Sequence, residues 1–221
     1  MLDGNAFDQP MARSALAGTA PVSTVSATGK RSGVVLAEIT LGRITQIIAR
    51  RGKADTVAAA LRDAVGIAPP RKPMRAASGD TAIVWSGPNQ WLLIRPRDAK
   101  AATELARKLT GLASITDQSD ARVHLHLTGP DVRNALAKLM MLDLHPTEFP
   151  VGTAAMTGIA HIPVHIWRLP DSGIKSGGQT HGSDPISPAF VIAGPQSYAT
   201  SLWHHVVVSA AEYGLDAQVL S

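Results

Sequence analysis

The sequence predicts an α+β protein built from two halves of similar layout, each a split βαβ or ferredoxin-like arrangement. Strand-like and helix-like segments follow one another in the order strand, helix, two strands, helix, strand, and the second half of the chain begins in the same way. Turns rich in Gly, Pro and Asn separate these segments. We therefore predict an extended N-terminal tail over residues 1–32, a first α+β half over 33–120 and a second α+β half over 121–221.

The tail and the first half differ in pattern. Residues 1–32 are rich in Ala, Ser, Thr and Gly without periodicity, so we expect no independent fold there and, if the tail is ordered, contact with another chain. An extended apolar stretch over 34–48 comes next. The remaining elements follow in chain order: a helix with Val57, Leu61 and Val65 on one face and Gly66 to end it, a linker with Pro69, Pro70 and Pro73, strands over 81–85 and 91–95 around the turn 86–90, a helix capped by Asp98 with Ala102, Leu105 and Leu109 on one face before Gly111, and a strand over 114–118.

The second half begins with a strand over 122–128, whose alternation sends its side chains to two opposite faces. One face receives Val123, Leu125 and Leu127, and the other receives Arg122, His124, His126 and Thr128. The remaining elements are a helix opened by Gly129-Pro130 with Val132, Leu136, Leu139 and Met140 as its buried stripe, strands over 156–159, 162–167 and 190–193, and a last helix opened by Gly194-Pro195 with Tyr198, Leu202, Val206 and Ala210 inward and Gly214 beyond its end. The low hydrophobicity of residues 169–188, rich in Gly, Ser and Pro, predicts a flexible surface insert.

The composition favours a cytoplasmic globular protein. The chain has 221 residues, 45% of them hydrophobic, and no apolar run approaches the roughly 20 residues that a membrane-spanning helix needs. Its start lacks the basic and then apolar pattern of a secretory signal. Cysteine is absent, which excludes disulfides, thiolate metal ligands and cysteine nucleophiles.

Basic residues outnumber acidic ones, giving a net charge of +4, but most of them are scattered along the chain. The densest basic cluster flanks a predicted helix and the proline linker and consists of Arg50, Arg51, Lys53, Arg71, Lys72 and Arg75. For this cluster we favour a solvated face or a contact with an acidic partner surface. Nucleic-acid binding would call for aromatic side chains that stack on bases beside the arginines, and only 4% of the residues are aromatic.

Histidine pairs are the first candidates for chemistry. His124 and His126 share a strand face, and His161 and His165 would share one if their segment stays extended. Two imidazoles at that spacing can begin a metal site, but a third ligand is not identifiable from the sequence. We favour histidines at the solvent or at an interface over metal ligands.

Carboxylates and aromatic residues give no stronger candidate. Asp117, Asp120, Asp143 and Glu148 lie near these elements, where strand-end caps and turns account for them better than an acid and base pair. His145-Pro146 is interpreted as a rigid connector. The sequence holds no G-x-S-x-G, G-x-G-x-x-G or G-x-x-x-x-G-K-[ST] motif. The four tryptophans are assigned to core packing, with Trp91 as a candidate interface anchor: Trp85, Trp91, Trp167 and Trp203.

Several short motifs, in order and with matching spacing over about residues 35–215, resemble the gamma subunit family of heterotetrameric sarcosine oxidase. They are Gly87-Pro-Asn-Gln-Trp-Leu-Leu-Ile94, Thr116-Asp-Gln-Ser119, Leu127-Thr-Gly-Pro130, Asp143-Leu-His-Pro146 with Phe149-Pro150, the segment from His161 to Trp167 and the segment from Tyr198 to Trp203. Each motif alone is weak. Six of them in the same order make the resemblance specific.

The resemblance implies a fold related to the folate-binding aminomethyltransferase T-protein and a place in a complex with alpha, beta and delta subunits. In that family FAD and covalent FMN belong to the beta subunit, NAD and the tetrahydrofolate site to the alpha subunit, and zinc to the delta subunit. The complex demethylates sarcosine oxidatively to glycine, with hydrogen peroxide and 5,10-methylenetetrahydrofolate formed. The resemblance gives the gamma subunit a structural role, so we assign no catalytic, cofactor-binding or metal residue to this chain.

Three alternatives stay open at this point. The equivalent subunit of N-methylglutamate dehydrogenase would have much the same sequence, since substrate choice lies in other chains. A stand-alone tetrahydrofolate-binding one-carbon protein would need a pocket with a carboxylate on the pterin. A basic RNA-binding module would show affinity that falls steeply with salt.

Overall fold

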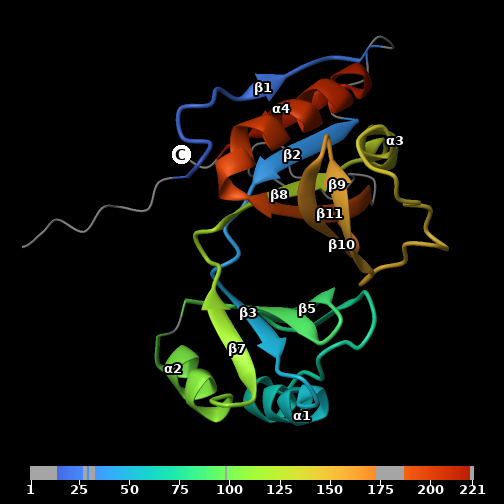
Figure 1. Cartoon of the computed structure of the whole chain (residues 1–221). Coiled ribbons are helices and arrows are strands. Elements are labelled where there is room, and N and C mark those ends of the chain that lie inside the picture. Colours follow the sequence, from blue (N-terminus) through green and yellow to red (C-terminus); the bar gives the residue numbers. More distant parts are fainter. Residues whose placement is uncertain (1–13, 27–28, 30–32, 98, 173–186, 220–221) are drawn as a thin grey trace, which may run out of the picture.

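A computed structural model describes residues 14–26, 29, 33–97, 99–172 and 187–219 and shows an α+β fold with two sheets, which confirms the predicted class. In Figure 1 the five-stranded sheet with helices α1 and α2 lies below, and the seven-stranded sheet with α3 and α4 lies above. We call these the five-stranded half and the seven-stranded half. No described helix has the length and apolar character that crossing a membrane requires.

The five-stranded half has the predicted ferredoxin-like arrangement with one strand more than predicted, the edge strand β4. Its elements are β3 (Arg43–Ala49), α1 (Ala54–Val65), β4 (Arg75–Ser78), β5 (Thr81–Gly87), β6 (Gln90–Arg95), α2 (Ala99–Lys108) and β7 (Ala113–Asp117). The antiparallel strands lie in the order β4-β5-β6-β3-β7, so β3, the first strand of this half in the sequence, lies between β6 and β7. Helix α1 buries Val57 and Leu61 as expected, and Gly66 ends it in the left-handed conformation, with φ of 72°.

The seven-stranded half repeats this layout around one inserted strand. Its elements are β1 (Val22–Ser23), β2 (Val34–Glu38), β8 (Arg122–Thr128), α3 (Val132–Ala137), β9 (Ala154–Ile159), β10 (Ile162–Ser172), β11 (Ser187–Pro195), the 3-10 turn η1 (Gln196–Tyr198), α4 (Ala199–Ala210), the 3-10 turn η2 (Ala211–Tyr213) and β12 (Leu215–Gln218). The order is β1-β12-β2-β8-β11-β10-β9, with β2 parallel to β12 and antiparallel to β8. Without β2 and the edge strand β1, the remaining order β12-β8-β11-β10-β9 corresponds to the order β7-β3-β6-β5-β4 of the other half.

The apolar stretch over 34–48 forms two strands in two sheets. Strand β2 pairs with β8 and β12, whereas β3 belongs to the five-stranded sheet. The bend between them uses Gly42, where φ is 78° and an added Cβ would lie 2.4 Å from the backbone oxygen of Arg95. The predicted boundary at residue 33 therefore differs from the boundary between the sheets. Apolar patterning marks both strands as buried but cannot say which sheet each one joins.

The predicted tail is partly built into the protein. Leu16 is fully buried in the seven-stranded half, and β1 pairs with β12 at the edge of its sheet. The Thr24 hydroxyl donates a hydrogen bond of 3.0 Å to the backbone oxygen of Ala211 and accepts one from the N–H of Leu215. Residues 14–26 thus lie against their own chain, in contrast to the expected contact with another chain. Residues 1–13, 27–28 and 30–32 lie outside the described part.

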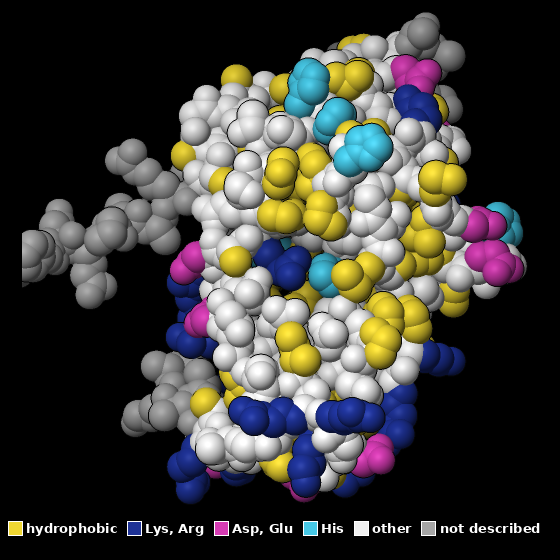
Figure 2. Space-filling model, in the orientation of Figure 1, with side chains coloured by type: hydrophobic (Ala, Val, Ile, Leu, Met, Phe, Trp, Pro, Cys, Tyr) yellow, Lys and Arg dark blue, Asp and Glu magenta, His cyan; other side chains and the backbone are white. Residues whose placement is uncertain are grey.

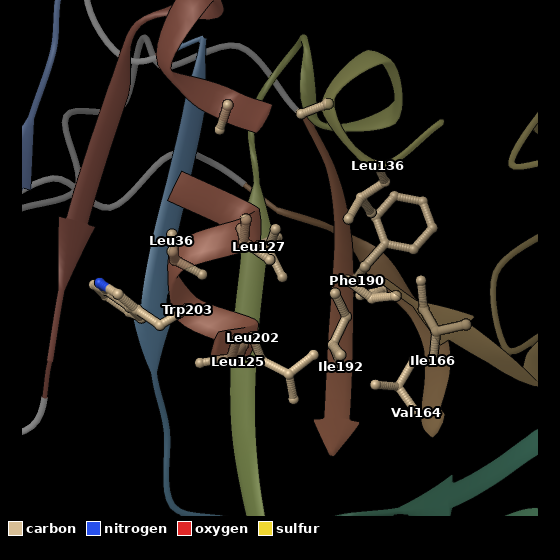
Figure 3. Packing of buried hydrophobic residues seen from close by; sticks show 14 of the residues in the cluster. Leu36, Leu125, Leu127, Leu136, Val164, Ile166, Phe190, Ile192, Leu202 and Trp203 are labelled. Atoms are coloured by element: carbon tan, nitrogen blue, oxygen red, sulfur yellow. The ribbon is translucent and has the colours of Figure 1, made fainter. Parts of the chain in front are cut away.

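Three apolar clusters organise the interior. The largest lies between the seven-stranded sheet and its helices, and Figure 3 shows Leu125, Phe190 and Ile192 pointing from strands toward Leu202 of α4 and Leu136 of α3. A second cluster lies under α1 and α2. The third joins the two halves and contains buried side chains from both sheets: Ile44, Ala82, Val84, Leu92, Ile94, Ala154, Trp167, Val191 and Ala193. The two sheets therefore share a core.

Element boundaries differ from the prediction at the last helix and at the insert before it. The last helix does not begin at Gly194-Pro195, because β11 continues through Pro195 and a 3-10 turn precedes α4. Tyr198 accordingly is 50% exposed and does not point inward. The predicted insert over 169–188 is shorter than expected, since β10 and β11 extend into both of its ends; residues 173–186 and the predicted cap Asp98 lie outside the described residues.

Candidate functional site

Buried polar side chains gather where the two sheets face each other. His124 of β8 and His165 of β10 both pair with Ala193 of the intervening strand β11, so all three side chains lie in one row on the same face of the sheet. This face turns away from α3 and α4 and toward the five-stranded sheet. His124 and His165 are 5% and 7% exposed. Between the two histidine positions, Ala193 contributes only a methyl group.

Arg122 and Ser86 complete what we call the inter-sheet polar cluster, defined as Ser86, Arg122, His124 and His165. A guanidinium nitrogen of Arg122 lies 3.3 Å from Nδ1 of His165. Because arginine only donates, Nδ1 of His165 accepts and its proton sits on Nε2. Ser86 comes from β5 of the other sheet and is 5% exposed. Four polar atoms of this cluster are buried without a hydrogen-bond partner: Oγ of Ser86, Nε of Arg122, Nε2 of His124 and Nε2 of His165.

Burial and the nearby guanidinium keep both imidazoles neutral. The pKa of His124 falls from 6.5 to about 4, first because burial disfavours the charged ring and second because Arg122 repels it. The pKa of His165 also falls to about 4 for the same two reasons in the same order, with the backbone carbonyl of Ser86 acting in the opposite direction. Burial lowers the pKa of Arg122, which nevertheless stays charged at neutral pH. The cluster therefore carries one positive charge.

The predicted histidine pairs are only partly brought together. His126 shares the face of His124 but is half-buried, and burial lowers its pKa. His161 is exposed and is not in a strand, because Ala160 and His161 form the turn between β9 and β10 with φ of 46° and 70°. The expectation that His161 and His165 share a strand face is therefore wrong. No group of three or more His, Asp or Glu among the described residues could hold a metal ion.

The candidate carboxylates lie apart, each in a local interaction. Asp117 pairs with Arg43 at 3.0 Å, and its pKa is lowered chiefly by the hydroxyl of Ser119, which donates to it, and then by the N–H of Ser119. Asp120 pairs with Arg97 at 3.2 Å. Asp117 is the last residue of β7, and Asp120 lies in the turn that follows it; each pairs with an arginine of the five-stranded half. These contacts are those of turn and strand-end carboxylates.

The loop after α3 holds the other two candidate carboxylates. Asp143 accepts the backbone N–H of His145 at 2.8 Å, as a turn residue does, and Glu148 is exposed. The Nδ1 atom of His145 lies 2.8 Å from the hydroxyl of Thr147. All of these contacts are within the loop, which agrees with a rigid connector.

The tryptophans lie mostly inside. Trp91 is 3% exposed in the core of the five-stranded half, and its Nε1 donates to the backbone oxygen of Pro70 at 2.8 Å. The idea that Trp91 anchors an interface is therefore wrong. Trp167 and Trp203 are buried, and Trp85 is half-buried. The sequence places Trp91 beside a Gly-Pro turn, where an indole can lie either at the edge of a sheet or in the core. Only the packing of the folded chain distinguishes these two positions.

The surfaces of the two halves differ in charge. Figure 2 shows Lys and Arg side chains concentrated over the five-stranded half, and histidines with hydrophobic side chains over the seven-stranded half. Of the predicted basic cluster, Arg75 is half-buried while Arg71 is exposed and pairs with Asp55 at 2.6 Å. Helix α4 contains no Lys, Arg, Asp or Glu. On the solvent side of this helix, Val208 is 60% exposed.

Sequence reasoning found only part of the inter-sheet polar cluster. Strand alternation placed Arg122 and His124 on one face, which the structure confirms. It could not place His165 beside them, because the register of β8, β11 and β10 is set by pairing across distant segments. Ser86 was assigned to a turn, and no local signal shows that it ends a strand facing His165.

Comparison with known proteins gives a consistent result. The family model described as sarcosine oxidase, gamma subunit family, matches residues 50–168. Curated proteins named sarcosine oxidase subunit gamma are similar to the chain. The one from Arthrobacter sp. is 37% identical over 146 residues, covering 64% of this chain and 71% of the relative. The one from Corynebacterium sp. (strain U-96) is 33% identical over 153 residues, covering 67% and 73%.

Solved structures agree with this result. The heterotetrameric sarcosine oxidase from Corynebacterium sp. U-96, in complex with pyrrole 2-carboxylate, contains a similar chain with 29% identity and a TM-score of 0.67, over 81% of this chain and 85% of that one. The glycine cleavage system aminomethyltransferase T from Bartonella henselae has 16% identity and a TM-score of 0.55, over 85% of this chain and 48% of that one. This second match concerns the fold alone and confirms the predicted likeness to the aminomethyltransferase fold.

Proposed function

The chain belongs to the sarcosine oxidase gamma subunit family, and on that premise we propose that it is the gamma subunit of a cytoplasmic heterotetrameric sarcosine oxidase complex. The observation that carries the proposal is the match over 81% of the chain to a chain of a solved heterotetrameric sarcosine oxidase. In this proposal its role is assembly with the alpha, beta and delta subunits. The flavin, nicotinamide, folate and zinc sites belong to those partners, and so does the demethylation of sarcosine.

The surface of the seven-stranded half supports a role in assembly. A helix that faces water in a lone globular protein usually presents charged residues on its outer side, and α4 has none. Thr200, Ser201, His204 and Val208 are exposed there. The cores of protein interfaces are poor in charged residues, and this face has that composition. We therefore assign the outer face of α4 to contact with a partner subunit.

The first test is affinity purification of the tagged full-length chain from its native cells. We expect three further chains to co-purify, with the visible absorbance of flavin and with turnover of sarcosine. Turnover of N-methylglutamate in place of sarcosine would assign the chain to the related dehydrogenase. A colourless and solitary monomer would contradict the assembly role, and tetrahydrofolate titration of that monomer would then test the stand-alone alternative.

A charge on the outer face of α4 tests where the partner binds. Val208→Arg places a guanidinium in the proposed contact, where its desolvation is not compensated, so we expect capture of the partner chains to weaken at least about tenfold. Val151→Arg is the matched control, because Val151 is also an exposed valine: it is 47% exposed, and Val208 is 60% exposed. Val151 lies outside α4, just before the edge strand β9. If both variants capture the partner chains equally well, α4 is not part of the interface.

A further inference from the structure

We propose that the inter-sheet polar cluster binds a carboxylate group between His124 and His165, beside Arg122. Nothing in the assembly role requires these residues, and the inference stands without it. Its first support is the group of four buried polar atoms without hydrogen-bond partners. Buried polar groups are almost always paired, and each exception calls for a missing water, ion or ligand.

The available groups in this cluster are donors. The tautomer set by Arg122 puts the proton of His165 on Nε2, which has no hydrogen bond of good geometry, although the backbone carbonyl of Ser86 lies near enough to raise the pKa of this ring. Nε of Arg122 is a second donor without a hydrogen-bond partner. Nε2 of His124 and the Ser86 hydroxyl can also donate. Among the described residues Arg122 forms no ion pair, so no carboxylate of this chain neutralises it there.

The charge of the cluster selects the class of ligand. Arg122 supplies one positive charge, and both imidazoles are neutral at pH 7. A carboxylate carries one negative charge, which balances the charge of Arg122. Its two oxygens can accept hydrogen bonds from the guanidinium and from the two imidazoles. A doubly charged phosphate would leave a negative charge uncompensated in a buried place. A metal cation would be repelled by the guanidinium.

The strand positions of the two histidines set the distance that the ligand has to bridge. His124 and His165 stand on strands separated by β11, so their Cα atoms are about 10 Å apart, at about 4.8 Å a strand. Ala193 between them contributes only a methyl group. Arg122 is half-buried and reaches solvent, and Figure 2 shows a Lys or Arg side chain and a histidine visible between the two halves of the molecule. In this proposal the anion enters beside Arg122.

The test is titration of the full-length chain, labelled with ¹⁵N at the histidine rings, with sodium acetate against sodium chloride at equal ionic strength. We expect saturable changes in the ring signals of His124 and His165, together with an upward shift of their titration midpoints, because a bound anion stabilises imidazolium. Arg122→Gln should weaken acetate binding at least tenfold. His204→Gln, which changes an exposed histidine of α4, is the matched control and should bind acetate as the unmodified chain does.

A second variant separates lost binding from lost folding. Ala193→Val keeps every polar group of the cluster and fills the space between the imidazoles, so we expect acetate binding to disappear while the near-ultraviolet spectrum of the tryptophans is kept. Absence of saturable changes, equal binding by Arg122→Gln, or tighter binding of inorganic phosphate than of acetate would overturn the proposal.

The same titration on the assembled complex identifies the source of the carboxylate. Binding that persists after assembly, and that Arg122→Gln removes, supports a free carboxylate ligand. Binding that is present in the isolated chain and disappears on assembly supports an acidic side chain of a partner subunit that occupies the same place. Neither result depends on turnover by the complex.

Discussion

The two halves of this protein share a strand order and differ in surface chemistry. Residues 33–120 contain 13 Lys and Arg against 8 Asp and Glu, whereas residues 121–221 contain 5 against 7. All eight histidines lie in the second of these ranges. One topology thus carries a basic surface in the five-stranded half and a histidine-rich, weakly charged surface in the seven-stranded half. Burial of the apolar faces of the strands stabilises this topology, which leaves the surface free to serve different contacts.

The strongest test of this comparison asks whether the halves fold as one unit. Trp167 is 2% exposed and lies in the cluster that joins the two sheets. Trp167→Ala removes a large buried side chain at that junction, so we expect the free energy of unfolding to fall by about 3–5 kcal/mol. Chemical denaturation followed by circular dichroism measures the loss, and two separate transitions in the variant would show that this junction couples the halves.

Trp85→Ala is the control for this experiment. Trp85 is half-buried in the five-stranded half and lies outside the cluster between the sheets. We expect a smaller loss of stability and a single transition. If Trp85→Ala costs as much as Trp167→Ala, or if the unmodified chain already unfolds in two transitions, the shared core does not couple the two sheets.

Acidification should destabilise the seven-stranded half selectively. The pKa values of His124 and His165 are about 4 in the folded protein, against 6.5 for an ordinary histidine as in the unfolded chain. Between pH 6.5 and pH 4 the unfolded chain therefore binds more protons than the folded chain. Stability therefore falls as pH falls from 6.5 toward 4. Between pH 7 and pH 5 we expect a loss on the order of 2 kcal/mol for each histidine. Burial lowers the pKa of His126 as well, which acts in the same direction.

The double variant His124→Gln and His165→Gln identifies the source of this pH dependence. Denaturation at pH 7 and pH 5 should show a much smaller difference between the two pH values in the variant than in the unmodified chain. His204→Gln and His205→Gln form the control pair, because these histidines lie on α4 and not between the sheets. An unchanged slope in the inter-sheet variant would show that the two rings titrate normally in the folded state.

Local signals explain which parts of the fold were predictable from the sequence. Val57 and Leu61 recur at helical spacing, and Gly66 supplies the left-handed end, so α1 was predictable from neighbours in the chain. The membership of β2 in the seven-stranded sheet depends on pairing with β8, roughly ninety residues later, and nothing in the sequence between 34 and 48 encodes it. Leu16 was missed for a similar reason, since an isolated apolar residue in a polar segment has no periodicity.

The residues of the inter-sheet polar cluster also differ in whether local patterns or long-range pairing place them. Arg122 and His124 were placed on one strand face by alternation within seven residues. His165 and Ser86 reach them only through strand pairing and through the packing of one sheet on the other. The site that carries our binding proposal is therefore made of residues that are individually ordinary and become unusual only when their burial is known.

The smallest expected effect on stability concerns the basic surface. Arg51 and Lys72 are exposed and form no ion pair among the described residues, so the double variant Arg51→Glu and Lys72→Glu should change the free energy of unfolding by no more than about 0.5 kcal/mol. If this surface steers an acidic partner, the same variant should slow the association with the partner chains at low salt. At about 1 M salt, where the screening length is about 3 Å, the difference from the unmodified chain should vanish. Equal association rates at low salt would show that these charges of the five-stranded half do not steer assembly.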